Sequence, residues 1–192
     1  MRFRSVALMG AAVWATASCS SGETKPRGQL IIALSTDMSV TKDMDEVRVQ
    51  VFRADGTALP DRQIPVLPAE PAPFGKPLPG TLAIVPPDAG GQQLLIRVSA
   101  RHLDPRTNVK LTRVVREAVV KVPTDRTAML RMPLRWLCDG RVKPIAGSDD
   151  DSYSSDCDKD ETCIAGECVP AEVDANALPD YTPEQVFGGG DD

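Results

Sequence analysis

The sequence has few of the residues on which enzyme sites and aromatic cores usually depend. It contains one histidine and only 4% aromatic residues in 192 positions. A single histidine excludes a histidine-rich metal site, and a catalytic triad would depend on His102 alone. No apolar run reaches the roughly 20 residues that a membrane-spanning helix needs. The net charge of −5 argues against nucleic acid as the main partner.

Proline and glycine are abundant instead, with 17 and 14 residues, and favour a loop-rich β chain. Apolar and polar residues alternate with period two in several runs, which is typical of half-buried strands. These runs lie near residues 30–34, 47–51, 94–101 and 130–137, with weaker strands near 63–66 and 81–85. A longer run spans 109–122, and its charged residues predict a strand with one solvent-exposed face. The proline-rich stretch between Pro60 and Pro87 should be a sheet edge or a surface crossover.

About seven strands in residues 29–137 predict a mainly β fold. The expected architecture is an antiparallel β-sandwich of immunoglobulin or transthyretin-like type, and a small open barrel is the alternative. No cysteine lies between Cys19 and Cys138, so the cysteine–tryptophan core of true immunoglobulin domains is absent. Trp136 shares the alternation phase of Leu130 and Met132, which predicts that it packs in the core.

Residues 1–18 have the layout of an export signal, with two arginines before an apolar run of about a dozen residues. Cleavage after Ala17 would produce a secreted protein that starts at Ser18. Alternatively, Thr16-Ala17-Ser18-Cys19 is similar to a bacterial lipobox, in which Cys19 is lipidated. Residues 19–28 would then be a flexible tether.

The cysteine count favours the lipobox. If lipid occupies Cys19, four cysteines remain, which is an even number suited to two disulfides after export. These are Cys138, Cys157, Cys163 and Cys168. A zinc site is the alternative, but tight Cys-x-x-Cys pairs are lacking. Three pairings are open, and the hairpin predicted between Cys163 and Cys168 favours Cys138–Cys163 with Cys157–Cys168.

Charge divides the chain at Cys138. Residues 19–137 carry 17 basic and 12 acidic side chains, whereas residues 138–192 carry 3 basic and 15 acidic ones. We therefore expect a basic β-sandwich at 29–137, a Cys-rich module at 138–170 and an irregular acidic tail at 171–192.

Four acidic residues of the module have the spacing of positions 1, 3, 5 and 12 of a calcium-binding loop. They are Asp156, Asp158, Asp160 and Glu167. Glu161 occupies the position where such loops need glycine, and two cysteines interrupt the segment. A solvated acidic loop is therefore the preferred interpretation, with weak calcium binding as the hypothesis beside it. No other cofactor is expected.

Several of these motifs occur together in a recognisable arrangement. The lipobox, the segment Trp136-Leu137-Cys138, the spacing Cys157-x5-Cys163-x4-Cys168 and the ending Pro179-Asp180-Tyr181-Thr182-Pro183-Glu184 are its parts. Together they resemble a group of outer-membrane-type lipoproteins of fruiting-body-forming Gram-negative bacteria, with a β-sandwich body and a C-terminal Cys-rich module. The resemblance implies a location and an architecture, and it carries no reaction.

We find no nucleophile elbow, paired-carboxylate motif or metal signature, and we expect the chain not to be an enzyme. Arg97, Arg101, Arg131 and Arg135 fall on outward strand phases. They predict a solvated basic face, or a face that meets the acidic module or an anionic envelope polymer.

The leading functional hypothesis is a lipid-anchored envelope protein, on the periplasmic or outer side of the outer membrane, that serves as a binding or structural module. The alternative is an exported inhibitor, or an accessory subunit of a secreted enzyme, that acts through its disulfide module.

Overall fold

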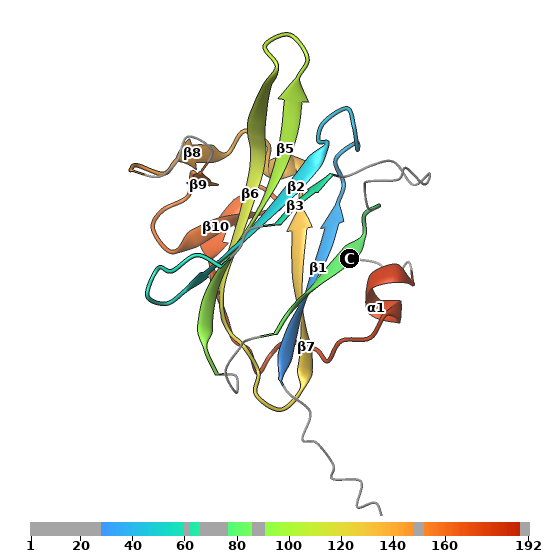
Figure 1. Cartoon of the computed structure of the whole chain (residues 1–192), viewed down its shortest axis with the longest axis vertical. Coiled ribbons are helices and arrows are strands. Elements are labelled where there is room, and N and C mark those ends of the chain that lie inside the picture. The colour runs from blue at the N-terminus through green and yellow to red at the C-terminus, as the bar shows by residue number, and fades with distance from the viewer. Residues whose placement is uncertain (1–27, 60–61, 66–76, 86–90, 148–151, 189–192) are drawn as a thin grey trace, which may run out of the picture.

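A computed structural model describes residues 28–59, 62–65, 77–85, 91–147 and 152–188 (Figure 1). The predicted signal peptide and almost all of the tether lie outside these residues. The strands are β1 (Gln29–Thr36), β2 (Glu46–Arg53), β3 (Arg62–Pro65), β4 (Gly80–Ile84), β5 (Gln93–Asp104), β6 (Val109–Lys121), β7 (Thr127–Leu134), β8 (Val142–Pro144), β9 (Tyr153–Ser155), β10 (Glu161–Ile164), β11 (Glu167–Pro170) and β12 (Glu172–Val173). The helices are the single-turn 3₁₀ helix η1 (Trp136–Cys138) and α1 (Glu184–Phe187).

Two sheets form the body. One has the strand order β4-β1-β7 and the other has the order β12-β6-β5-β2-β3. The predicted antiparallel sandwich is confirmed only in part, because the sheets are mixed: β1 pairs with β7 in parallel and β12 pairs with β6 in parallel. The fold is nevertheless mainly β, and the seven strands β1 to β7 fall within the predicted 29–137 segment. The weaker predicted strands correspond to β3 and β4, which each pair with one neighbouring strand.

The core lies between these two sheets, as period-two alternation predicts. The even-numbered residues of three strands supply much of the core. They are Leu30 and Ile32 of β1, Leu94, Ile96, Val98 and Ala100 of β5, and Leu130 and Met132 of β7. The core cluster is aliphatic and sulfur-containing, with no aromatic side chain among its described members. Because two separate sheets face each other, the described residues form a sandwich rather than the alternative open barrel. The finer likeness to immunoglobulin or transthyretin stays a prediction.

The prediction that Trp136 packs in the core is wrong. Strand β7 ends at Leu134, and Trp136 begins η1, where its side chain is 48% exposed. Its ring lies beneath the guanidinium of Arg113, with 5.9 Å between the guanidinium carbon and the ring centroid. The alternation that placed Trp136 in phase with the core therefore stops one residue before it.

The Cys-rich module packs against the second half of β6, so the solvated face predicted for this strand is limited to its first half. Glu117 and Val115 point away from the core, yet both are buried. The Thr162 hydroxyl accepts a hydrogen bond of 2.8 Å from the Glu117 backbone N–H, and the Thr162 side chain is fully buried. The Gly140 N–H donates to the Arg113 carbonyl at 2.8 Å. These two bonds satisfy backbone groups at the edge of β6, and the burial of Val115 and Glu117 shows that its outer face is covered as well.

Two disulfides stabilise the module, with the pairing that the sequence favoured. Cys138 bonds to Cys163, and Cys157 bonds to Cys168. The sulfurs of the first bridge belong to buried residues that join the core cluster, whereas Cys168 is exposed. The first bridge therefore attaches the β10–β11 hairpin to the end of the body.

The tail is more ordered than the predicted irregular segment. Residues Glu172–Val173 form β12 on the edge of β6, and the chain then crosses to β7, where Asp180 bridges Ala128. Arg126 fixes this crossing, because its guanidinium donates to the carbonyls of Ala175 and Leu178 at 2.7 and 3.0 Å. As a result, α1 at the end of the tail lies on the outer face of the three-stranded sheet (Figure 1).

Candidate functional site

The four arginines predicted to share a basic face lie on two different faces. Arg97 and Arg101 are on β5, in the five-stranded sheet. Arg131 is on β7 in the three-stranded sheet, and Arg135 directly follows that strand. All four point away from the core, as their phases predict. The two sheets turn their outer faces in opposite directions, however, so one continuous basic face does not form.

The β5 pair is buried and neutralised. Arg97 donates to the Glu117 carboxylate at 2.8 Å and lies over the Phe52 ring, 5.1 Å from its centroid. Arg101 donates to the Glu46 carboxylate at 3.0 Å, and Lys110 contacts the same carboxylate. Each arginine lies directly across the ladder from its acidic partner, so strand register creates both pairs. Arg97 and Arg101 therefore hold neighbouring strands together through buried ion pairs.

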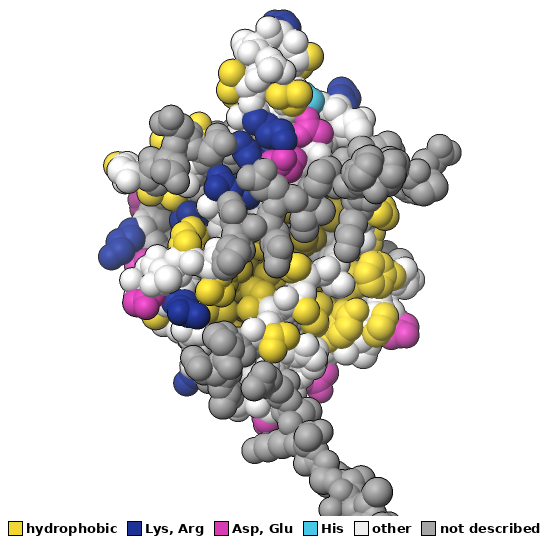
Figure 2. Space-filling view, viewed as in Figure 1, with side chains coloured by type: hydrophobic (Ala, Val, Ile, Leu, Met, Phe, Trp, Pro, Cys, Tyr) yellow, Lys and Arg dark blue, Asp and Glu magenta, His cyan; other side chains and the backbone are white. Residues whose placement is uncertain are grey.

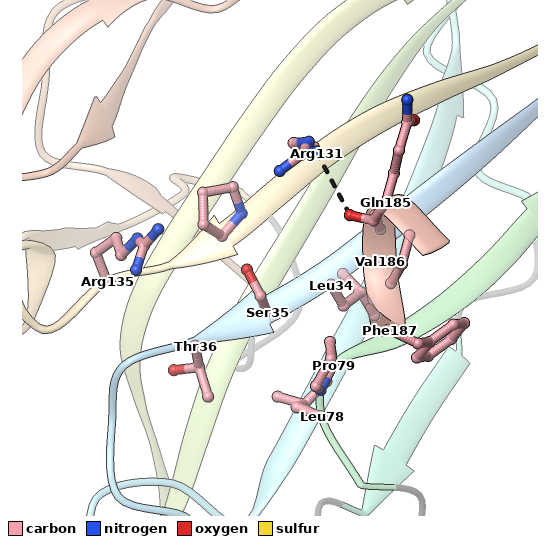
Figure 3. A pocket seen from close by; sticks show the side chains of 12 residues that line it. Leu34, Ser35, Thr36, Leu78, Pro79, Arg131, Arg135, Gln185, Val186 and Phe187 are labelled. Atoms are coloured by element: carbon pink, nitrogen blue, oxygen red, sulfur yellow. Dashed lines mark hydrogen bonds between the residues drawn. The ribbon is translucent and has the colours of Figure 1, made fainter. Parts of the chain in front are cut away.

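The β7 pair borders a hollow of about 500 Å³, which we call the sheet groove. Its floor is formed by the ends of β1 and β7, and its walls by α1 and by the residues before β4 (Figure 3). Arg131 and Arg135 stand on the β7 side, whereas Val186 and Phe187 of α1 stand on the other side.

The groove exists because its floor has short side chains. Ala33 and Ser35 of β1 lie on the outer face, opposite Arg131 and Pro133 of β7 in the ladder. Longer β-branched residues, which favour such positions, would fill the space. The α1 wall is held by the tail crossing and by a hydrogen bond of 3.4 Å from Arg131 to the Gln185 carbonyl.

The electrostatics of the sheet groove are positive. None of the described residues that line it is a carboxylic acid, a histidine or a cysteine. Arg135 forms an ion pair with the Asp37 carboxylate, with 4.0 Å between the nitrogen and the oxygen. Figure 2 shows hydrophobic side chains gathered in the middle of one face of the molecule. The Lys and Arg side chains above them in the view stand beside Asp and Glu side chains and the histidine, and do not belong to the groove.

The acidic residues of the calcium hypothesis do not converge. Asp158 and Asp160 belong to the turn before β10, and Glu167 begins β11. Within the described residues, the one close group of three potential metal ligands is Asp156 with Cys157 and Cys168. Both cysteines are in a disulfide, and Arg141 lies 3.2 Å from Asp156, so this group is no cation site. Calcium binding by the acidic loop stays an untested hypothesis.

His102 does not stand in a catalytic arrangement with the neighbours that the structure describes. Its Nδ1 is 3.4 Å from the Asp45 carboxylate, at the base of the projecting β5–β6 hairpin. Asp45 also accepts the Leu103 N–H at 2.7 Å, so this contact stabilises the hairpin. No serine or cysteine accompanies the pair in the interactions that the described residues make.

Two further arginines have shifted pKa values. A bidentate contact with Asp139, at 2.5 and 2.7 Å, raises the pKa of Arg113 and fixes the start of the module. Burial lowers the pKa of Arg116 to about 10. Arg116 lies opposite the core residue Val98 in the ladder, and its Nε and Nη1 atoms are buried without a hydrogen-bond partner in the structure.

Sequence reasoning missed the α1 side of the groove. The sequence assigned no ligand-binding role to Val186, Phe187 or Leu78. Pro183 followed by Glu184 is a typical start of a helix, but a helix of four residues leaves almost no periodic signal.

Among the described residues, no helix has the length and apolar character needed to cross a membrane. Comparison of the chain with protein-family models, with curated proteins and with solved structures finds no match.

Proposed function

We propose that the chain is an exported, non-enzymatic lipoprotein of the cell envelope, anchored to the outer membrane through Cys19, whose body is a binding module with the sheet groove as its ligand site. The observation that carries this proposal is the groove itself. Its volume of about 500 Å³ lies in the range of small-molecule and peptide sites, and apolar and cationic side chains share its walls.

The chemistry of the groove supports binding rather than catalysis. Acid–base catalysis needs a group that can exchange a proton near neutral pH, and nucleophilic catalysis needs a nucleophile with a base beside it. The described lining residues provide hydroxyls at Ser35 and Thr36 and two arginines. Arginine stays protonated, so it binds and orients an anion but does not act as a base.

The position of the groove suits an anchored protein. Two disulfides suggest an extracellular or periplasmic protein. The backbone N–H of Gly28, the last residue of the predicted tether, donates to the Thr124 carbonyl at the end of the body opposite the β5–β6 hairpin (Figure 1). Ala33, where the groove begins, is five residues farther along β1, or about 17 Å. A ligand in the groove would therefore be held away from the anchored end.

An exported inhibitor that acts through the disulfide module is the second candidate. Inhibitory loops must be exposed to reach an enzyme, and Ala165, Glu167 and Cys168 of the β10–β11 hairpin are exposed, although Thr162 and Cys163 are buried against the body.

The mass of the mature N-terminus tests the anchoring. We expect a lipid adduct on Cys19, and a Cys19→Ala chain should leave the membrane fraction. An unmodified N-terminus at Ser18 would contradict the proposal.

Site-specific photo-crosslinking tests the binding. A cross-linking residue at Ser35 should give a discrete adduct in the envelope, whereas the same residue at Thr107, on the exposed β5–β6 turn, should not. The adduct should disappear when Ala33→Leu fills the groove. Equal adducts at both positions, or none at Ser35, would contradict the assignment of the ligand site.

A further inference from the structure

Strand β4 forms one edge of the three-stranded sheet, because β1 lies on one of its sides and no described strand lies on the other (Figure 1). The Gln29 N–H donates to the Arg126 carbonyl beside β7, so the odd-numbered residues of β1 face β7 and the even-numbered ones face β4. In the antiparallel ladder Ile84 lies opposite Leu30, so the even-numbered residues of β4 bond to β1. The odd-numbered residues of β4 therefore direct their backbone N–H and C=O groups to the free edge.

Three residues present these groups, namely Thr81, Ala83 and Val85. All three are exposed, and among the described residues none is a hydrogen-bond partner for them across this edge. Natural proteins usually protect an exposed edge with charged side chains, with proline or with a bulge. The segment from Gly80 to Val85 contains no charged residue and no proline, and its ladder with β1 is regular. This edge is therefore open to pairing with another strand.

An apolar hollow of about 200 Å³ lies directly beside this edge. Its lining combines β4 with Val49 and Val51 of β2 and with Leu59, so it lies where the two sheets of the body meet at their sides. Every described side chain that lines it is aliphatic. A strand that carried charges here would lose their hydration without gaining an ion pair. The occupant of this edge is therefore an uncharged, apolar strand.

The sequence of β4 itself meets these requirements. When a second copy of β4 lies antiparallel to the first about a two-fold axis at Ala83, Thr81 of each copy lies opposite Val85 of the other. Each of these facing pairs exchanges two hydrogen bonds, so the free groups of all three residues are satisfied. The β-branched side chains of Thr81 and Val85 then form favourable cross-strand pairs. The small side chain of Ala83 avoids crowding at the axis, where it meets its own copy.

We propose that the free edge of β4 is a dimer interface, at which a second copy of the chain continues the three-stranded sheet in antiparallel pairing about a two-fold axis at Ala83. The combined sheet has the order β7-β1-β4-β4-β1-β7. Its axis is perpendicular to the sheet, so the apolar hollows of the two copies lie on the same side of the interface. The interface is isologous and closes with two copies. This inference goes beyond the proposed function and does not depend on a ligand in the sheet groove.

The dimer is compatible with the proposed anchor. Ala83 lies opposite Ile31, three residues beyond Gly28, so Gly28 of each copy is about 10 Å from the axis along the strand. The two chains therefore enter the body near the middle of the dimer. Both anchors at Cys19 reach one membrane when the strands run along its surface.

Cysteine cross-linking of the full chain in the cell envelope tests the pairing and its register. Ala83→Cys should give a covalent dimer, because the Cα atoms of a facing, hydrogen-bonded pair are about 5.5 Å apart, within the range of a disulfide. Thr81→Cys alone should not, since its two copies are about 13 Å apart along the strands. Thr81→Cys produced together with Val85→Cys should restore the covalent dimer.

The matched control is Thr107→Cys on the exposed β5–β6 turn, which should remain monomeric on a non-reducing gel. Equal cross-linking of Thr107→Cys, or of Thr81→Cys alone, would overturn the proposal. So would the absence of a dimer from Ala83→Cys, or a cross-link from Ala83→Cys to a different protein only.

Light scattering of the full chain in detergent micelles tests the association without a cross-link, and the protein mass should be that of two chains. Ala83→Pro removes an N–H that bonds only across the axis and leaves the ladder with β1 intact, so it should weaken the dimer at least tenfold. Thr81→Lys with Ala83→Lys places like charges across the axis and should do the same. Thr107→Lys is the control and should stay dimeric, and circular dichroism checks that each variant folds. A monomeric unaltered chain, or a dimer that neither edge variant weakens, would overturn the proposal.

Discussion

On the outer face of the five-stranded sheet, Arg97 and Arg101 are 8% and 3% exposed, and each is paired with a carboxylate across the ladder. On the outer face of the three-stranded sheet, Arg131 is exposed beside a groove whose described lining has no carboxylate. Both faces have outward arginines at strand spacing. What differs is the cover: the Cys-rich module packs on β6, whereas only the short α1 approaches β1 and β7.

This difference distinguishes arginines that stabilise the fold, such as Arg97 and Arg101, from arginines that border the groove, such as Arg131. Removing one partner from a buried ion pair leaves an uncompensated charge and costs several kcal/mol, so such residues are fixed by folding. An arginine at an open groove contributes little to stability. Its position is therefore not required by folding, and the following predictions test that division.

The largest effect should come from the module that covers the five-stranded sheet. Removing the Cys138–Cys163 bridge, with both cysteines changed to Ala, should lower the free energy of unfolding by about 3.5 kcal/mol, because the bridge closes a 25-residue separation. Removing Cys157–Cys168, with a separation of 11, should cost about 2.8 kcal/mol. Urea unfolding followed by circular dichroism measures both, and a larger cost for the second bridge would contradict the role of the first as the attachment to the body.

Arg116→Met should have the next largest effect, and in the opposite direction. The Nε and Nη1 donors of Arg116 are buried without hydrogen-bond partners, so its replacement by an apolar side chain of similar length should raise the free energy of unfolding by about 2 kcal/mol. Arg106→Met, on an exposed turn, is the control and should change little. Destabilisation by Arg116→Met would show that this guanidinium has a partner in solution.

Thr162→Val should lower the free energy of unfolding by about 1–2 kcal/mol, since it leaves the buried Glu117 N–H without its acceptor at nearly constant volume. Thr162→Ser retains the hydroxyl and should recover most of the hydrogen-bond contribution. If the two variants are equally stable, the module is not held to β6 by this bond.

Changes in the sheet groove should have much smaller effects on stability. Arg131→Gln with Arg135→Gln should shift the free energy of unfolding by no more than about 0.5 kcal/mol, because open surface charges contribute little. The same chemical unfolding experiment applies. A loss of several kcal/mol would mean that these arginines support the fold as Arg97 and Arg101 do, and the division between the two faces would fail.

The smallest effect concerns the β5–β6 turn, which belongs to neither face. The Asp104 carboxylate accepts the Arg106 N–H at 2.8 Å, and this bond lowers the pKa of Asp104 below its ordinary value of 3.8. The bond therefore stabilises the fold above pH 3.8 and is lost as the pH falls through the lower folded pKa. Titration of Asp104 followed by NMR should show a midpoint below 3.8, and a midpoint at or above that value would contradict the turn geometry.

The sequence allowed the strands and the bridges to be predicted, because alternation and cysteine spacing are local signals. It also predicted the outward phase of all four arginines correctly. It could not predict what covers each face, since that depends on which strand is adjacent to which module after folding. The parallel pairing of β1 with β7 joins segments 98 residues apart, as the Gln29–Thr127 hydrogen bond illustrates. For the same reason, neither the burial of Arg97 nor the position of α1 beside the groove could be predicted from the sequence, because both depend on long-range contacts.

Hydrogen–deuterium exchange of the full chain, with and without a detergent extract of the cell envelope, tests the division of the two faces most directly. We predict slower exchange with the extract in the groove segments 33–36, 131–135 and 184–188, and unchanged exchange in 114–120 and 161–168 of the covered face. Slower exchange confined to the module or to β6, with no change along β1, β7 and α1, would contradict the central claim that the three-stranded sheet carries the binding site.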